Sequence, residues 1–190
     1  MLVSGVPGAG KSTIAGPLAA ELGFGLLGKD RIKEVLADAL EIGATEVGTL
    51  DSGVLDSGAA DAGPANRGTS RRLGAAAMEL MWALAADLPA VVLDANFWVD
   101  DERLPGRIRA LSARPVEIHC TCPAELAAQR YRDRSARLHH IHAQAAGASL
   151  GPEAFARSGR PVGMGAVITV DTAGPVDIPA LAAAVRILLP

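Results

Sequence analysis

The strongest constraint on the fold of this chain is the stretch GVPGAGKS at residues 5–12. It fits the Walker A pattern G-x-x-x-x-G-K-[ST] at every fixed position, a pattern typical of a loop that surrounds phosphate groups with backbone N–H donors. Such close contact requires residues with small side chains and permissive dihedral angles, which Gly5, Gly8 and Gly10 supply. The stretch therefore predicts a strand, then a phosphate-binding loop, then a helix whose N-terminus faces the anion.

The residues around this loop have distinct expected roles. Lys11 is expected to bridge the β- and γ-phosphates of a nucleoside triphosphate, and the Ser12 hydroxyl to hold Mg²⁺. An apolar strand over residues 1–4 and a helix over residues 12–22, which contains Pro17, are predicted to flank the loop. The predicted nucleotide-binding residues are Gly5, Val6, Pro7, Gly8, Ala9, Gly10, Lys11, Ser12 and Thr13.

The composition indicates one globular domain with a substantial core, since the chain has 190 residues of which 49% are hydrophobic and 21% charged. The net charge of −3 argues against a broad surface for nucleic acid, so any anion site is expected to be local. Only Cys120 and Cys122 are cysteines, which gives no disulfide framework. Without a basic leader or a long apolar run, we expect a cytoplasmic protein with no membrane span. The oligomeric state is not indicated.

Apolar runs alternate with helical patterns along the chain. Further strands are predicted at residues 24–27, 90–93, 115–120 and 166–170, and helices over residues 32–40, 70–84, 103–113, from 123 onward and over 179–189. This alternation predicts an α/β fold with a parallel sheet. Residues 43–69 are rich in Gly, Ala, Asp, Ser and Thr and have little periodicity. We expect a flexible insertion there, either without a chemical role or as a cover for a substrate.

Two aspartates follow predicted strands. Asp30 stands between the end of the second strand and the start of a helix, and Asp94 directly follows the third strand. Open α/β sheets place their sites at this edge. A carboxylate there suits Mg²⁺, so Asp94 is the predicted second metal ligand. The alternatives are that Asp94 caps a turn and that Asp30 caps its helix.

Basic residues crowd the helix that begins at Pro123. Arg130 and Arg134 are four residues apart, so they share a helix face on which they could converge on the same phosphates. The alternative is a solvated basic face. A zinc site is a weaker hypothesis, because C-x-C is not the usual structural spacing and the candidate ligands lie on both sides of this helix. These candidates are His119, Cys120, Cys122, His139, His140 and His142.

Taken together, the phosphate loop, Asp30, Asp94 and the arginine helix resemble the small P-loop kinases. The likeness is to the branch related to chloramphenicol phosphotransferase, zeta-toxin-type kinases and the kinase domain of polynucleotide kinase, and it spans nearly the whole chain. The resemblance implies a single domain over residues 1–190 with the P-loop NTPase fold, a five-stranded parallel sheet, and a helical lid over residues 123–142.

The resemblance also implies a chemistry, which is transfer of the ATP γ-phosphate to a hydroxyl group of a small molecule with Mg²⁺ as cofactor. Asp30 matches the position of the base that accepts the hydroxyl proton, Arg130 and Arg134 match lid positions, and Asp171 and Thr172 fall near the adenine. Lys11 and the lid arginines would neutralise the developing charge. Two alternatives stay open: a kinase of nucleic-acid 5′-hydroxyls, and a regulatory NTPase without an acceptor.

Overall fold

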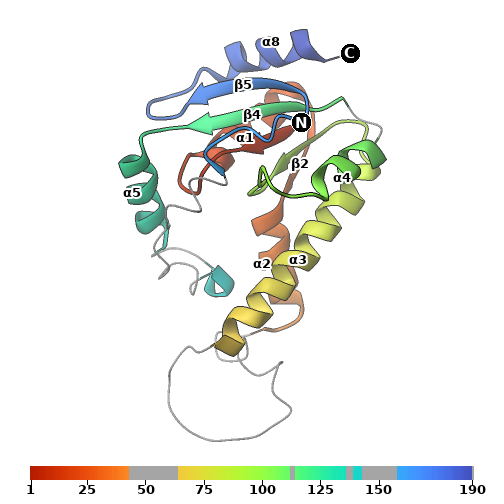
Figure 1. Ribbon diagram of the computed structural model, residues 1–190, viewed down its shortest axis with the longest axis vertical. Coiled ribbons are helices and arrows are strands. Elements are labelled where there is room, and N and C mark those ends of the chain that lie inside the picture. Colours follow the sequence, from red (N-terminus) through yellow and green to blue (C-terminus); the bar gives the residue numbers. More distant parts are fainter. Residues whose placement is uncertain (43–63, 112–113, 136–138, 143–157, 190) are drawn as a thin grey trace, which may run out of the picture.

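The computed structural model describes residues 1–42, 64–111, 114–135, 139–142 and 158–189 (Figure 1). Each of the five predicted strands is present, with bounds within one residue of those expected. In chain order the elements are β1 (Leu2–Ser4), α1 (Lys11–Leu22), β2 (Gly25–Gly28), α2 (Lys29–Ala39), α3 (Pro64–Ala86), β3 (Val91–Asp94), α4 (Leu104–Ala110), β4 (Val116–Thr121), α5 (Ala124–Ser135), the 3₁₀ turn η2 (His140–His142), β5 (Ala166–Asp171) and α8 (Ile178–Leu188).

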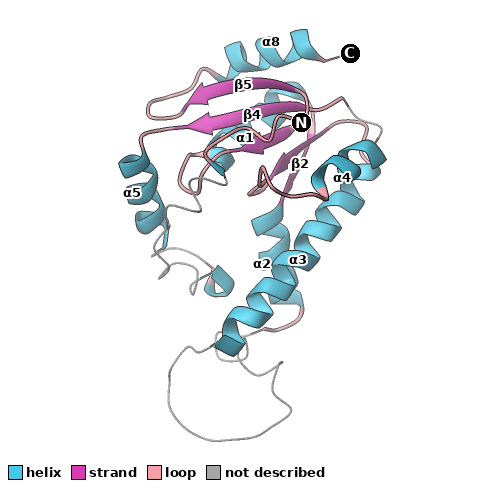
Figure 2. Cartoon of the chain, in the orientation of Figure 1, coloured by secondary structure: helices cyan, strands magenta, loops and turns pink. Residues whose placement is uncertain are grey.

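The strands form one parallel sheet in the order β2-β3-β1-β4-β5 (Figure 2). The predicted α/β P-loop fold with a five-stranded parallel sheet is confirmed. Since β1 and β3 are neighbours and β2 pairs with β3, the carboxyl ends of these three strands lie side by side. The loop after β1, Asp94 at the end of β3 and the start of α2 after β2 therefore meet at one edge of the sheet.

Helices cover both faces of the sheet, because successive side chains of a buried strand point to opposite sides. On one side Val3 packs in a cluster with Leu18 of α1 and Val185 of α8. On the other side Leu2 packs with Met81 of α3 and, through the same cluster, with α4. Among the described residues, no helix is long and apolar enough to cross a membrane.

The helix α3 begins earlier than expected. The sequence predicts a flexible insertion over residues 43–69 and a helix from Ser70. Residues 43–63 lie outside the described part of the chain. The prediction is wrong for residues 64–69, because α3 already begins at Pro64. Thr69 is buried and Leu73 packs against Ala37 of α2. Packing of α3 on α2 thus outweighs the weak helix propensity of this polar segment, and proline is tolerated in a first helical turn.

A buried polar cluster joins β1 to β4. The hydroxyl of Ser4 lies within hydrogen-bond distance of Glu117 and of His119 Nδ1, 2.9 Å away. Glu117 also accepts hydrogen bonds from the backbone N–H groups of Val162 and Gly163, each at 2.9 Å. These contacts give the buried Glu117 carboxylate its hydrogen-bond partners and connect His119 to Ser4. The cluster therefore fixes the end of β1, which leads into the phosphate-binding loop.

Candidate functional site

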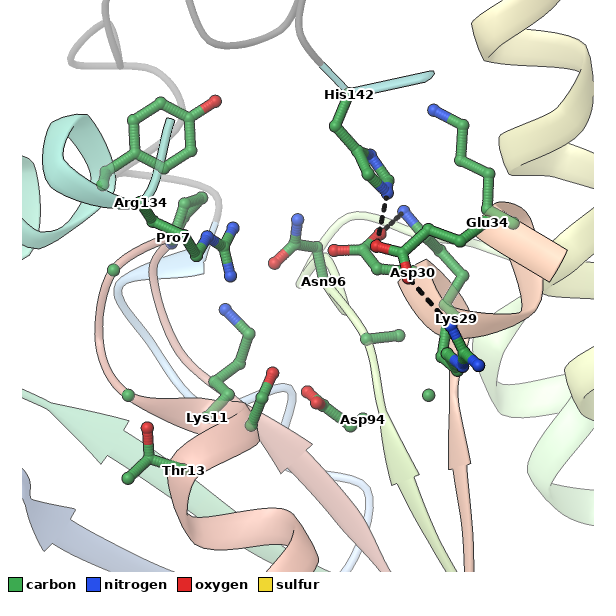
Figure 3. A pocket seen from close by; sticks show the side chains of 18 of the residues that line it. Pro7, Lys11, Thr13, Lys29, Asp30, Glu34, Asp94, Asn96, Arg134 and His142 are labelled. Carbon is green, nitrogen blue, oxygen red and sulfur yellow. Dashed lines mark ion pairs between the residues drawn. The ribbon is translucent and has the colours of Figure 1, made fainter. Parts of the chain in front are cut away.

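A cavity of about 840 Å³ opens at the carboxyl ends of β1, β2 and β3 (Figure 3). The phosphate-binding loop borders one side, α2 another, and α5 with η2 the rest. The structure brings together most of the residues predicted from the sequence. Those that line the cavity are Pro7, Gly8, Gly10, Lys11, Ser12, Thr13, Asp30, Asp94, Arg130 and Arg134.

The phosphate-binding loop depends on glycine at two positions of close backbone approach. Gly5 has φ of 132°, and a Cβ atom there would lie 2.3 Å from the Cys120 carbonyl oxygen of β4. Gly8 has φ of 86°, and its Cβ would lie 2.1 Å from the Ala127 carbonyl oxygen of α5. Both the dihedral angles and the contacts exclude side chains. The loop is therefore fixed between the sheet and α5, as a site for close contact with phosphates requires.

Lys11 lies at the base of the cavity and its side chain points into it (Figure 3). Its ammonium donates hydrogen bonds to the carbonyl oxygens of Gly5 at 2.9 Å and Val6 at 3.1 Å. Burial lowers the pKa of Lys11 to about 8, although the nearby Asp94 carboxylate acts in the opposite direction. Lys11 is thus mostly protonated at neutral pH. A phosphate group would give this ammonium a charged partner in place of neutral carbonyls.

Ser12 and Asp94 form the pair predicted to hold a metal ion. The Ser12 hydroxyl and the Asp94 carboxylate both line the cavity. Burial raises the pKa of Asp94, and the nearby Ser12 hydroxyl partly offsets the effect. A hydroxyl and one carboxylate that open onto a cavity are oxygen donors of the kind that Mg²⁺ accepts beside phosphate oxygens and water. The residues present therefore fit Mg²⁺.

Asp30 is the second residue of α2, and Gly28 is the N-cap of that helix. The interpretation of Asp30 as a helix N-cap is therefore wrong, and its carboxylate is not committed to the backbone of α2. Instead, Asp30 Oδ1 lies 2.7 Å from the ammonium of Lys29. Burial disfavours the ionised carboxylate, but the charge and hydrogen bond of Lys29, together with the charges of His142 and Arg134, outweigh it and lower the pKa of Asp30. Asp30 is thus an ionised carboxylate at the cavity wall.

The two arginines of α5 differ in their surroundings. Arg130 donates hydrogen bonds to the carbonyl oxygens of Thr172 at 2.9 Å and Ala173 at 3.3 Å, which ties α5 to the loop after β5. The guanidinium of Arg134 points into the cavity toward Lys11 (Figure 3). Its charge acts on the pKa values of Lys11, Asp30 and Asp94. Arg134 is therefore the arginine that faces the centre of the site.

The two predicted adenine-binding residues, Asp171 at the end of β5 and Thr172 directly after it, do not line this cavity. The buried Thr172 hydroxyl lies 2.7 Å from the Ala9 carbonyl oxygen and 2.9 Å from that of Thr121, so it connects the end of β5 to the phosphate-binding loop. Asp171 accepts a hydrogen bond from the Ala173 N–H at 2.8 Å. Both side chains thus support the loop structure, and a role in contact with adenine stays a prediction.

Several cavity residues carry no motif and were not predicted. Lys29, Lys33 and Glu34 belong to α2 and lie within one helical turn of Asp30, a spacing that could have indicated them. His142 lies far away in sequence, and its Nε2 is 3.4 Å from Glu34 Oε1. Nothing in the local sequence pointed to this contact.

The segment His139–His142 packs on α2 and α3 rather than around a metal. His139 Nε2 lies 2.9 Å from Asp38 Oδ1, and Ile141 is buried with Ala37 and Leu73. Within the described ranges, no group of three or more His, Cys, Asp and Glu side chains is placed to hold a metal ion. The predicted lid over residues 123–142 therefore includes α5 on one side of the cavity and this docked segment on another, while residues 136–138 lie outside the described chain.

Comparison with known proteins agrees with this geometry. Residues 1–149 match a family model described as AAA domain. A structure of a "putative kinase" from Chloroflexus aurantiacus is 27% identical, with a TM-score of 0.72, and the match covers 100% of this chain and 97% of that one. Shikimate kinase from Acinetobacter baumannii, solved with shikimate, shares the fold at 16% identity and a TM-score of 0.53, over 97% and 89% of the two chains. No curated protein sequence matches significantly.

Proposed function

The chain belongs to the AAA domain family, whose model matches residues 1–149, and from this premise we propose that it is an ATP- and Mg²⁺-dependent kinase of a small-molecule hydroxyl. The observation that carries the proposal is the set of residues that line the cavity described above. A phosphate-binding loop and an inward-pointing arginine border it on one side, and an ionised aspartate faces them from α2. The likeness over the full chain to the Chloroflexus aurantiacus protein described as a "putative kinase" supports kinase activity.

In the proposed reaction the acceptor hydroxyl oxygen bonds to the γ-phosphorus of ATP as the bond from that phosphorus to the β–γ bridging oxygen breaks. ADP leaves with the electron pair, and the hydroxyl proton passes to Asp30. Phosphoryl transfer depends on positioning and on stabilisation of charge, which Lys11 and Arg134 supply at the phosphates. Mg²⁺, held by Ser12 and Asp94, would offset charge on the phosphate oxygens.

The positions of the elements around the cavity support a division of roles between them. The side chains of α1 and β3 would contact the nucleotide phosphates, and α2 would face the acceptor. The helix α5 would cover the phosphates as a lid, and the loop after β5 would lie beside the base. A carboxylate that is already ionised is suited to accept a proton without first losing one of its own.

The test is a product assay with purified protein, Mg·ATP and separate pools of hydroxyl-bearing metabolites, antibiotics and 5′-hydroxyl oligonucleotides. The proposal predicts that a pool of small molecules raises ADP release and yields a product heavier by one phosphate. A phosphorylated oligonucleotide would instead support the polynucleotide kinase. ADP release that is the same with every pool, with no phosphorylated product, would contradict a kinase and favour the regulatory NTPase.

A further inference from the structure

The charged side chains of α2 that line the cavity do not balance. Lys29 pairs with Asp30 at 2.7 Å, and Arg31 pairs with Glu34 at 3.6 Å. Lys33 is the remaining charged residue of this wall, and none of the described carboxylates lies within ion-pair distance of it. Among the described residues, the acceptor side of the cavity therefore carries one cation in excess when His142 is neutral.

His142 does not change this balance at neutral pH. It lies beside Glu34 on the same side of the cavity. Burial is the largest influence on His142 and lowers its pKa, although Asp30 and Glu34 act in the opposite direction. The imidazole is therefore uncharged in most molecules at pH 7, and Lys33 carries the excess charge.

Lys33 is unusual because a buried ammonium normally has an anionic partner. Lys33 is 6% exposed, and its ammonium donates one hydrogen bond, to the Ser70 hydroxyl at 2.7 Å. That hydroxyl donates in turn to the Ile141 carbonyl oxygen at 3.1 Å. An ammonium has three donors, so the described contacts leave capacity for a ligand. Burial lowers the pKa of Lys33 to about 8, which leaves it mostly charged at pH 7.

We propose that the acceptor is an anion, and that its carboxylate or phosphate group binds to Lys33 while its hydroxyl meets Asp30. The inference rests on the proposed kinase function. An anionic group would supply the charged partner that Lys33 does not have among the described residues, and would recover part of the cost of its burial. Asp30 and Lys33 are three residues apart on one helix, so their side chains lie on the same face. This spacing lets one small molecule contact both.

The first experiment compares acceptor pools of matched size with Mg·ATP: hydroxy acids, sugar phosphates, and uncharged sugars with nucleosides. Phosphorylated product is read by mass. The proposal predicts that product forms from one of the two anionic pools, and which pool reacts identifies carboxylate or phosphate as the group at Lys33. Product chiefly from the uncharged pool would overturn the inference and leave the kinase function intact. Product from no pool would contradict the kinase function and, with it, the anionic acceptor.

The second experiment uses the acceptor so identified and three variants. Lys33→Met keeps the aliphatic part of the side chain but removes the charge, and should raise the acceptor KM about 10- to 100-fold with little change in the KM for ATP. Lys33→Arg should recover most of the loss. Ser70→Ala removes the hydrogen bond to α3 but keeps the ammonium, so its acceptor KM should stay near that of the unmodified protein.

These variants separate binding from a purely structural tie between α2 and α3. If Lys33 acts only through Ser70, Ser70→Ala will reproduce the effect of Lys33→Met, and the inference is wrong. An unchanged acceptor KM in Lys33→Met overturns it as well. Arg109→Gln, which removes a charge from an exposed side chain of α4 that does not line the cavity, is the matched control and should leave the acceptor KM unchanged. Thermal melts identify any variant that fails to fold. If Lys33→Met does not fold, the acceptor KM values of Lys33→Arg and Ser70→Ala still test the inference.

Discussion

Lys29 and Asp30 are adjacent in sequence, and the Lys29 ammonium lies 2.7 Å from Asp30 Oδ1 at the wall of the cavity. Burial is the largest influence on the pKa of Asp30 and raises it, but Lys29, His142 and Arg134 together hold the pKa below its usual value. Lys29 is the largest of the three lowering influences. The proposed base is therefore kept ionised chiefly by its neighbour in the sequence.

The Lys29–Asp30 pair predicts a change in pH dependence. A base must be ionised to accept a proton, so activity falls as the pH drops through its pKa. Lys29→Met removes the largest influence that lowers the pKa of Asp30, and the acid limb of the kcat/KM profile should move to higher pH. Arg31→Gln, on the same helix but exposed, should leave that limb in place. An acid limb that does not move in Lys29→Met would show that Asp30 does not control it.

Gly8→Ala should disrupt the phosphate-binding loop. The new Cβ would lie 2.1 Å from the Ala127 carbonyl oxygen, and φ of 86° would be strained for alanine. Strain of this kind costs about 1–3 kcal/mol before the clash is counted, so both the free energy of unfolding and the affinity for ATP should fall. Gly74→Ala is the control, because its Cβ meets nothing within 4 Å and alanine favours the helix by about 1 kcal/mol. Equal stability of the two variants, measured by urea unfolding, would contradict this account of the loop.

Substitutions of the two arginines of α5 should have different kinetic effects. Arg134 points into the cavity, so Arg134→Gln is expected to lower kcat on the order of 10³-fold, as for other arginines that stabilise a transferring phosphoryl group. Arg130 binds the carbonyl oxygens of Thr172 and Ala173, so Arg130→Gln should mainly weaken nucleotide binding and stability. Steady-state kinetics and calorimetric titration with ATP would measure both effects. A larger loss of kcat in Arg130→Gln would reverse the assignment.

Thr172→Val should destabilise the protein through the loop rather than through contact with adenine. The substitution removes the hydroxyl donor from the Ala9 carbonyl oxygen, which costs about 1–3 kcal/mol for a buried group, whereas the Thr121 carbonyl oxygen keeps its hydrogen bond from the Thr172 N–H. Thr172→Ser keeps the donor and should lose much less. If Thr172→Val is as stable as the unmodified protein but discriminates ATP from GTP differently, the residue contacts the base instead.

The sequence predicted the fold well because its signals are local and agree with one another. Three local signals each indicate the structure of their own segment: the glycines of the loop, the short apolar runs and the aspartates after two strands. The alternating order of strands and helices then predicts a parallel sheet. Asp94 and Asp30 were found because strand ends meet at one edge of the sheet.

Other features depend on contacts between distant segments, which no local pattern reports. The start of α3 at Pro64 follows from packing on α2, and the place of His142 beside Glu34 follows from docking of a segment more than 100 residues away. The connection of Thr172 to Ala9 is of the same kind. Propensity and spacing carry little information about such pairs, because tertiary contacts override them.

The measurement that most directly tests the account is the rate of phosphoryl transfer to the identified acceptor by Asp30→Asn, set beside its affinity for Mg·ATP. Asparagine keeps the shape of the side chain but cannot accept the proton. If Asp30 is the base, transfer should fall about 10²- to 10⁴-fold while the affinity for Mg·ATP stays close to that of the unmodified protein. Transfer at the original rate would contradict the proposed mechanism, and a matching loss of ATP affinity would assign Asp30 to the nucleotide instead.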